Sequence, residues 1–142
     1  MEHAILSAQG LGKAFGAQVV LSGVDLALAA REVVCVIGPS GSGKTTLLRC
    51  LALLETPAAG RIRMRGTVVS EPRPARAVRS AARAVRADIG MVFQQFNLWP
   101  HMTVLENVIE APMRARRTPR DQAVADAERL LAKVGMAEKR DA

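Results

Sequence analysis

A glycine-rich run of nine residues has the composition and spacing of a phosphate-binding loop. It fits the pattern G-x-x-x-x-G-K-[ST] with Gly38, Pro39, Ser40, Gly41, Ser42, Gly43, Lys44, Thr45 and Thr46. The three glycines allow successive backbone N–H groups to point inward as a nest for an anion. We expect Lys44 to reach the outer phosphates of a ligand and the Thr45 hydroxyl to ligate Mg²⁺.

The segments on both sides of this loop are the elements that must position it. Residues 33–37 form a short apolar run, which predicts a strand buried on both faces. Residues 46–54 have the pattern of a buried helix, whose N-terminal N–H groups and dipole would add to the anion site. Because strand, loop and helix stand in this order, we favour a phosphate site over a glycine-rich turn that matches by chance.

The positive charge of the chain comes from one stretch. Residues 61–86 hold eight arginines and one glutamate, a net charge of +7, which equals that of the whole chain. Within residues 73–86 the arginines recur at helical spacing. This spacing predicts a solvated amphipathic helix, with an acidic partner or a lipid headgroup as the alternative. Because the excess charge is local, we do not expect a nucleic-acid partner.

Three further stretches predict strands, and the aromatic residues are unevenly distributed. Residues 4–30 read as short strands and turns, residues 58–69 as an edge hairpin, and residues 89–93 as a second buried strand. Three of the four aromatic rings lie in residues 93–99, in and before an irregular turn. The fourth, Phe15, is predicted equally well as a platform for adenine or as a core ring.

Capping signals predict two helices near the end of the chain. Thr103 and Glu106 have the spacing of a capping box, and Pro112 is expected to end the helix that they begin. Thr118 is expected to cap the next helix, and Gly135 to stop it.

Taken together, these stretches resemble the ATP-binding subunits of ABC transporters. More narrowly, they resemble the polar and basic amino acid uptake group that includes the histidine permease. The resemblance covers nearly the whole chain. It is carried by Phe15-Gly16, by residues 20–26, 38–50 and 54–57, and above all by residues 91–108, a sequence specific to this group.

The resemblance implies an α/β chain with the P-loop NTPase fold of ABC ATPases, present in part. The expected parts are an antiparallel β subdomain, part of the parallel core sheet and the start of the helical subdomain. Residues 1–96 would form the β subdomain and partial core, and residues 97–142 the start of the helical subdomain.

The resemblance also implies roles for individual residues. Phe15 falls where the family stacks an aromatic ring on adenine, and residues 38–46 fall on the Walker A loop that binds ATP. Gln94 falls on the glutamine that ligates Mg²⁺ together with Thr45. Residues 96–101 fall in the region that faces the coupling helix of the permease. ATP and Mg²⁺ are thus the implied cofactors.

The family continues with a signature sequence, an acidic strand end with a catalytic glutamate and a switch histidine, none of which occurs here. We therefore expect a truncated ATP-binding subunit of an amino acid importer, with no catalytic residue for hydrolysis. The alternative is a non-catalytic remnant that docks on a permease. In the family, the strands that flank the phosphate-loop strand also come from the part after residue 142.

The implied partners are transmembrane permease subunits, a second ATP-binding subunit and, indirectly, an amino acid-binding protein outside the membrane. The first residues have no signal-peptide pattern, and no run approaches the roughly 20 apolar residues that cross a bilayer. The expected location is therefore cytoplasmic, peripheral on the inner face of the cell membrane. The identity of the transported amino acid is not encoded in this chain.

Overall fold

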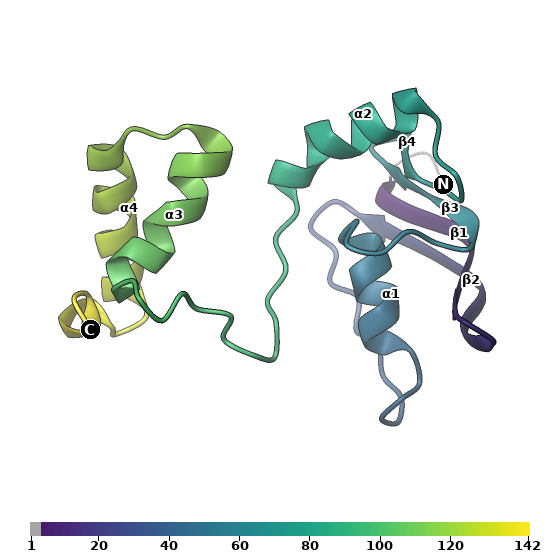
Figure 1. Cartoon of the computed structure of the whole chain (residues 1–142), viewed down its shortest axis with the longest axis horizontal. Helices are drawn as coiled ribbons and strands as arrows, with labels where there is room; N and C mark the ends of the chain where they lie inside the picture. Colours follow the sequence, from purple (N-terminus) through teal and green to yellow (C-terminus); the bar gives the residue numbers. More distant parts are fainter. Residues whose placement is uncertain (1–3) are drawn as a thin grey trace. The chain divides into compact units, whose positions relative to one another are not determined.

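The computed structural model describes residues 4–142. The chain divides after Met91 into two compact units, which we call the first unit, up to Met91, and the second unit, Val92–Ala142 (Figure 1). The subdomain boundary expected between residues 96 and 97 stays a prediction. No helix in the described part of the chain has the length and apolar character needed to span a membrane.

The first unit is built on one antiparallel sheet, as the sequence predicts. Its strands are β1 (Ala4–Phe15), β2 (Gln18–Ala29), β3 (Ala59–Met64) and β4 (Thr67–Ser70), in the spatial order β2-β1-β3-β4. The segment before residue 30 thus forms one long hairpin rather than several short strands.

The predicted edge hairpin is confirmed, because β4 lies at the edge of the sheet. Its two-residue turn has positive φ at both positions, 49° at Arg65 and 81° at Gly66, a combination that fits the twist of tight hairpins. Position 60 in β3 can also be occupied only by glycine. A Cβ atom there would lie 2.3 Å from the carbonyl oxygen of Gly10 in β1.

Two helices and the sheet share the hydrophobic core of the first unit. α1 (Lys44–Leu51) contributes buried residues to it, and α2 (Arg76–Val85) packs half-buried apolar residues against it. A short 3-10 turn, η1 (Arg86–Asp88), follows α2. The largest fully buried side chains are Leu11, Cys50, Ile62 and Val69.

The two segments predicted as buried strands, residues 33–37 and 89–93, are not strands in the structure. Ile37 is 91% exposed and Val92 is 99% exposed. An apolar run becomes a strand only where a neighbour pairs with its backbone groups, and every strand pair among the described residues is antiparallel and lies elsewhere. The prediction of a buried strand is therefore wrong for both segments.

The second unit is a helical hairpin of α3 (Val104–Arg116) and α4 (Arg120–Lys133), followed by a short 3-10 turn, η2 (Ala137–Lys139) (Figure 1). The two helices bury a shared cluster of Leu105, Ile109, Ala123 and Ala127. The capping box is confirmed. The Glu106 N–H donates to Thr103 Oγ1 at 3.2 Å, and the Thr103 N–H donates to Glu106 Oε2 at 2.8 Å.

The other helix ends differ in part from the sequence predictions. Pro112 lies inside α3, which continues to Arg116, because proline removes one backbone donor while the packed face holds the helix together. The cap of α4 is Pro119 rather than Thr118, without a side-chain hydrogen bond. Gly135, with φ at 72°, follows the end of α4 as predicted.

Candidate nucleotide-binding site

Residues 38–43 form a largely exposed loop that leads into α1, and residues 44–46 are the first residues of that helix. The helix begins at Lys44, two residues earlier than the sequence predicts, and Gly43 is its N-cap residue with φ at 89°. Gly43 also packs closely against the sheet. A Cβ atom there would lie 3.0 Å from the carbonyl oxygen of Val20 in β2. Both constraints explain why glycine occupies this position.

The N-terminus of α1 retains its capacity to bind an anion. Gly43 supplies no side-chain cap, and the first turn has no acidic residue that could satisfy the free N–H groups. The hydroxyl of Thr45 lies on this exposed first turn and has no hydrogen-bond partner among residues 4–142. An uncapped N–H array beside a free hydroxyl fits a phosphate with Mg²⁺.

Lys44 folds back over the loop that precedes it. Its Nζ donates to the carbonyl oxygen of Gly38 at 2.9 Å, to that of Pro39 at 2.7 Å and to Ser42 Oγ at 3.4 Å. The ammonium group is therefore held at the loop, where a phosphate that enters would meet it. The pattern alone could not show these contacts.

Phe15 lies at the end of β1 and is 49% exposed. It pairs with Gln18 across the β1–β2 turn. Val20, two residues after Gln18 on β2, lies next to Gly43 of the loop. The structure thus brings Phe15 and the phosphate loop to the same end of this hairpin. An exposed ring at that place fits a stacking role better than a core role.

Two residues that support Phe15, Lys13 and Glu55, were not predicted from the sequence. The Lys13 ammonium lies 4.9 Å from the centroid of the Phe15 ring, within the range of a cation–π interaction. Lys13 Nζ also donates to Glu55 Oε2 at 2.9 Å and to the carbonyl oxygen of Thr56 at 2.8 Å. Lys13 and Glu55 are separated by 42 positions, so no local pattern could reveal the pair.

Two groups near this cluster have shifted pKa values. The hydrogen bond from Lys13 lowers the pKa of the Glu55 carboxyl, and the charges of Lys13 and Arg49 lower it further. Burial raises the pKa of the Cys50 thiol, so this cysteine is a neutral core residue at physiological pH.

Gln94 and residues 96–101 belong to the second unit, whereas the phosphate loop belongs to the first. Gln94 is exposed and lies outside any helix or strand. Phe96 and Trp99 are 92% and 57% exposed, which is unusual for rings of this size. The segment therefore presents large apolar surfaces to solvent.

Asn107 fixes the turn that carries Trp99, and sequence analysis missed this role. Its Oδ1 accepts from the Trp99 N–H at 2.8 Å. Its Nδ2 donates to the carbonyl oxygens of Trp99, Met102 and Thr103 at 3.2, 3.0 and 3.0 Å. One side chain on α3 thus holds the backbone on both sides of residues 100 and 101. The Trp99 and His101 rings also pack edge to face, with centroids 6.1 Å apart.

Comparison with known proteins gives consistent matches. A family model described as "ABC transporter" matches residues 21–142. The L-cystine transport system ATP-binding protein of Escherichia coli is 48% identical over 134 residues, which cover 94% of this chain and 54% of that protein. The arginine transport ATP-binding protein of Bacillus subtilis is 45% identical over 137 residues, which cover 96% and 55%.

A solved structure also matches. The ATP-binding cassette MJ0796, as a dimer in a post-hydrolysis state bound to ADP and phosphate, is similar with a TM-score of 0.73 and 29% identity. The match covers 89% of this chain and 56% of the cassette chain. The chain spans about half the length of the curated relatives it matches.

Proposed function

Because this chain belongs to the ABC transporter family, we propose that it binds Mg-ATP through residues 38–46 as part of the ATP-binding subunit of an amino acid importer. The observation that carries the proposal is the arrangement of the loop. Three consecutive residues, 43–45, supply an uncapped helix N-terminus, the Lys44 ammonium and the Thr45 hydroxyl.

The groups of the proposed site would have different roles in binding. The N–H groups at the start of α1 would donate to phosphate oxygens, and Lys44 would transfer its hydrogen bonds from the Gly38 and Pro39 carbonyls to the outer phosphates. Thr45, with Gln94 of the second unit, would hold Mg²⁺, which neutralises phosphate charge when bound. Phe15 would stack on the adenine.

The proposal concerns binding and not turnover. The 142 residues contain no Asp-Glu pair, and they lack the signature sequence that the family places against ATP on a second subunit. We therefore limit the proposal to the binding of the nucleotide by these residues.

Two relatives are named for the transport of L-cystine and of arginine, which supports a polar or basic amino acid as the cargo of the complete system. The second unit would supply the contact with the permease, through the exposed rings of Phe96 and Trp99. Large rigid rings favour this role because they bury much surface at little entropic cost. A peripheral location on the cytoplasmic face of the membrane follows from such a contact.

Substitution of Phe15 tests the nucleotide site. Phe15→Ala removes the stacking surface and should weaken ATP binding about tenfold, whereas Phe15→Trp, which keeps a ring, should stay within about twofold of the unchanged chain. Equilibrium binding of ATP with Mg²⁺ measures both. If Phe15→Ala bound ATP as tightly as Phe15→Trp, the adenine role of Phe15 would be refuted.

A further inference from the structure

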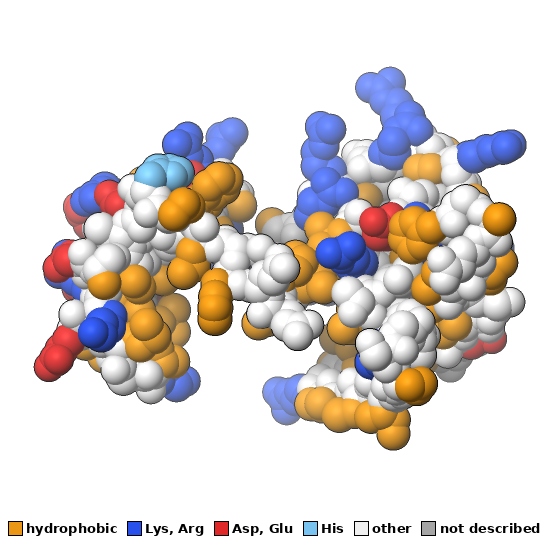
Figure 2. Space-filling model, turned by 60° about the horizontal axis from the view of Figure 1, so that its bottom comes forward, with side chains coloured by type: hydrophobic (Ala, Val, Ile, Leu, Met, Phe, Trp, Pro, Cys, Tyr) orange, Lys and Arg blue, Asp and Glu red, His pale blue; other side chains and the backbone are white. Residues whose placement is uncertain are grey.

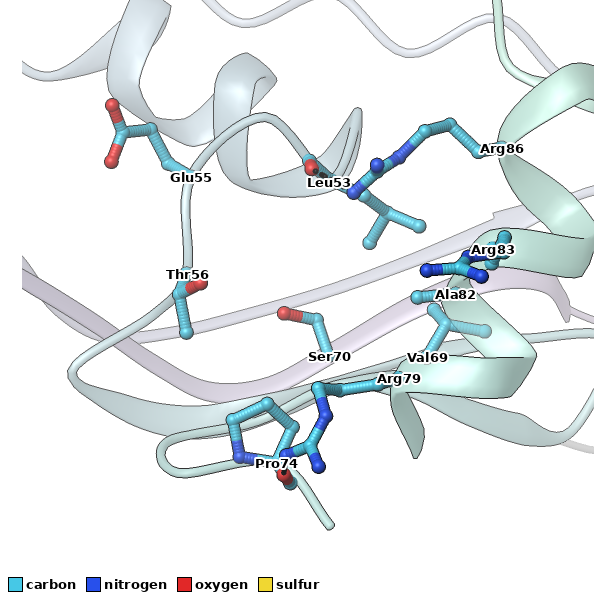
Figure 3. A pocket seen from close by; sticks show the side chains of 10 residues that line it. All are labelled: Leu53, Glu55, Thr56, Val69, Ser70, Pro74, Arg79, Ala82, Arg83 and Arg86. Atoms are coloured by element: carbon cyan, nitrogen blue, oxygen red, sulfur yellow. Dashed lines mark hydrogen bonds between the residues drawn. The ribbon is translucent and has the colours of Figure 1, made fainter. Parts of the chain in front are cut away.

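A cavity of about 300 Å³ lies in the first unit, and none of residues 38–46 lines it (Figure 3). It is formed by the segment after α1, the end of β4 and one face of α2. Its polar walls include Ser70, Arg79, Arg83 and Arg86. The nucleotide-binding proposal gives this cavity no role, although it gathers three of the eight arginines that make the chain basic.

The three arginines follow one another along a single helical face. Arg79 and Arg83 are four residues apart on α2, and Arg86 comes three residues later, directly after the helix. Figure 2 shows basic side chains standing out from the surface of the first unit. Like charges this close repel one another, so an anion among them would be favourable.

Two of these guanidinium groups are fixed at the rim of the cavity. Arg79 Nη1 donates to the carbonyl oxygen of Pro74 at 2.5 Å, and Arg86 Nη2 donates to that of Leu53 at 3.4 Å. Arg83, between them, has no hydrogen bond or ion pair within the described part of the chain. Its five N–H donors therefore remain available to a ligand.

The remaining wall of the cavity contributes the hydroxyl group of Ser70 and the carboxylate of Glu55. Ser70 is 8% exposed, has no side-chain hydrogen bond within residues 4–142, and directs its hydroxyl into the cavity (Figure 3). Glu55 also lines the cavity, but its carboxylate is paired with Lys13 at 2.9 Å. The three arginines thus dominate the potential inside.

The geometry points to a second anion site in this cavity, which binds a phosphate monoester group through Arg83 and the Ser70 hydroxyl. Guanidinium forks match the oxygens of phosphate in a bidentate manner, and a dianion neutralises several arginines better than a single carboxylate does. The apolar side chains of Leu53 and Ala82 in the wall would accommodate the ester carbon. The inference is independent of the nucleotide site.

A titration with inorganic phosphate at constant ionic strength tests the proposal on the full chain. The backbone amide NMR signals of Ser70 and Arg83 report the cavity, and those of Gly41 and Gly43 report the phosphate loop in the same spectra. We expect saturable shifts at Ser70 and Arg83. Arg83→Gln should weaken phosphate binding at the cavity about tenfold, and Arg83→Lys, which keeps the charge but not the fork, should weaken it less.

Arg76→Gln is the matched control, because it removes the same charge from the same helix at a residue that does not line the cavity. It should leave phosphate binding within about twofold. Equal losses in Arg83→Gln and Arg76→Gln would overturn the proposal, since they would indicate unspecific attraction. Acetate that binds as tightly as phosphate, or an absence of shifts at Ser70 and Arg83 in the folded chain, would also overturn it.

Two probes identify the source of the phosphate group. Glycerol 3-phosphate represents a soluble ester, and phosphatidylcholine vesicles with and without phosphatidic acid represent a lipid headgroup. Shifts with glycerol 3-phosphate alone support a soluble ligand. A lipid headgroup is supported if the chain sediments with vesicles that contain phosphatidic acid, if Arg83→Gln abolishes this sedimentation and if Arg76→Gln preserves it. A chain that responds to neither probe contradicts the proposal.

Discussion

At the scale of single residues, two lysines organise the candidate nucleotide site in different ways. Lys44 donates to loop carbonyls and can transfer those hydrogen bonds to a ligand. Lys13 is only 13% exposed at its side chain and is bound to Glu55 and Thr56. Because it also lies over the Phe15 ring, Lys13 restrains the ring on which adenine is proposed to stack.

The Lys13–Glu55 pair predicts a defined pH dependence. The pKa of Glu55 is lowered in the folded chain, so the stabilisation by this pair is present at neutral pH and is lost as the pH falls through that lowered pKa. Lys13→Met removes the hydrogen bond and should raise the pKa of Glu55 toward its ordinary value. A ¹³C NMR titration of the Glu55 carboxyl carbon measures the change.

Arg49→Gln is the control for this titration, because Arg49 contributes the smallest of the effects that lower the pKa of Glu55. It should move that pKa less than Lys13→Met does. An unchanged pKa of Glu55 in Lys13→Met would show that the hydrogen bond is not its main cause.

At the scale of elements, the turn before α3, residues 96–101, is the surface that we propose as a docking site. Its rings are exposed, yet Asn107 holds its backbone with four hydrogen bonds. A surface that is ordered before binding loses less entropy when a partner covers it. The turn is thus suited to docking rather than to burial in its own unit.

Co-purification with transmembrane permease subunits tests this docking. Trp99→Ala should abolish it, and Asn107→Ala should weaken it because the turn is released while the rings remain. Leu130→Ala is the control, since Leu130 is an exposed apolar residue of α4 outside the turn. If Trp99→Ala left the co-purification intact, the contact with the permease would have to lie on another surface.

Local chemistry made some elements predictable from the sequence, and long-range pairing made others unpredictable. The capping box of Thr103 and Glu106 and the edge hairpin of residues 58–69 depend on neighbours in sequence, so their patterns were sufficient. The apolar run of residues 33–37 was not sufficient, because a strand also needs a partner strand. The arginine spacing predicted a helical face, but the cavity walls at Leu53 and Ser70 come from distant segments.

At the scale of the whole molecule, the fold class expected from the sequence is confirmed. The chain has the P-loop NTPase fold of ABC ATPases in part, with an antiparallel sheet and several helices. The proposed nucleotide ligands are divided between its two units, with Phe15 and residues 38–46 in the first and Gln94 in the second. Binding of the phosphates therefore depends chiefly on the first unit.

The most direct test of nucleotide binding is a calorimetric titration of the chain with ATP and Mg²⁺, on the unchanged sequence and on Lys44→Ala. We predict saturable binding that Lys44→Ala weakens at least about tenfold, because a charge-assisted contact to phosphate is lost. Lys133→Ala, which removes a lysine from the last turn of α4, should have no effect. Equal affinity in Lys44→Ala, or no binding by the folded unchanged chain, would contradict the proposal.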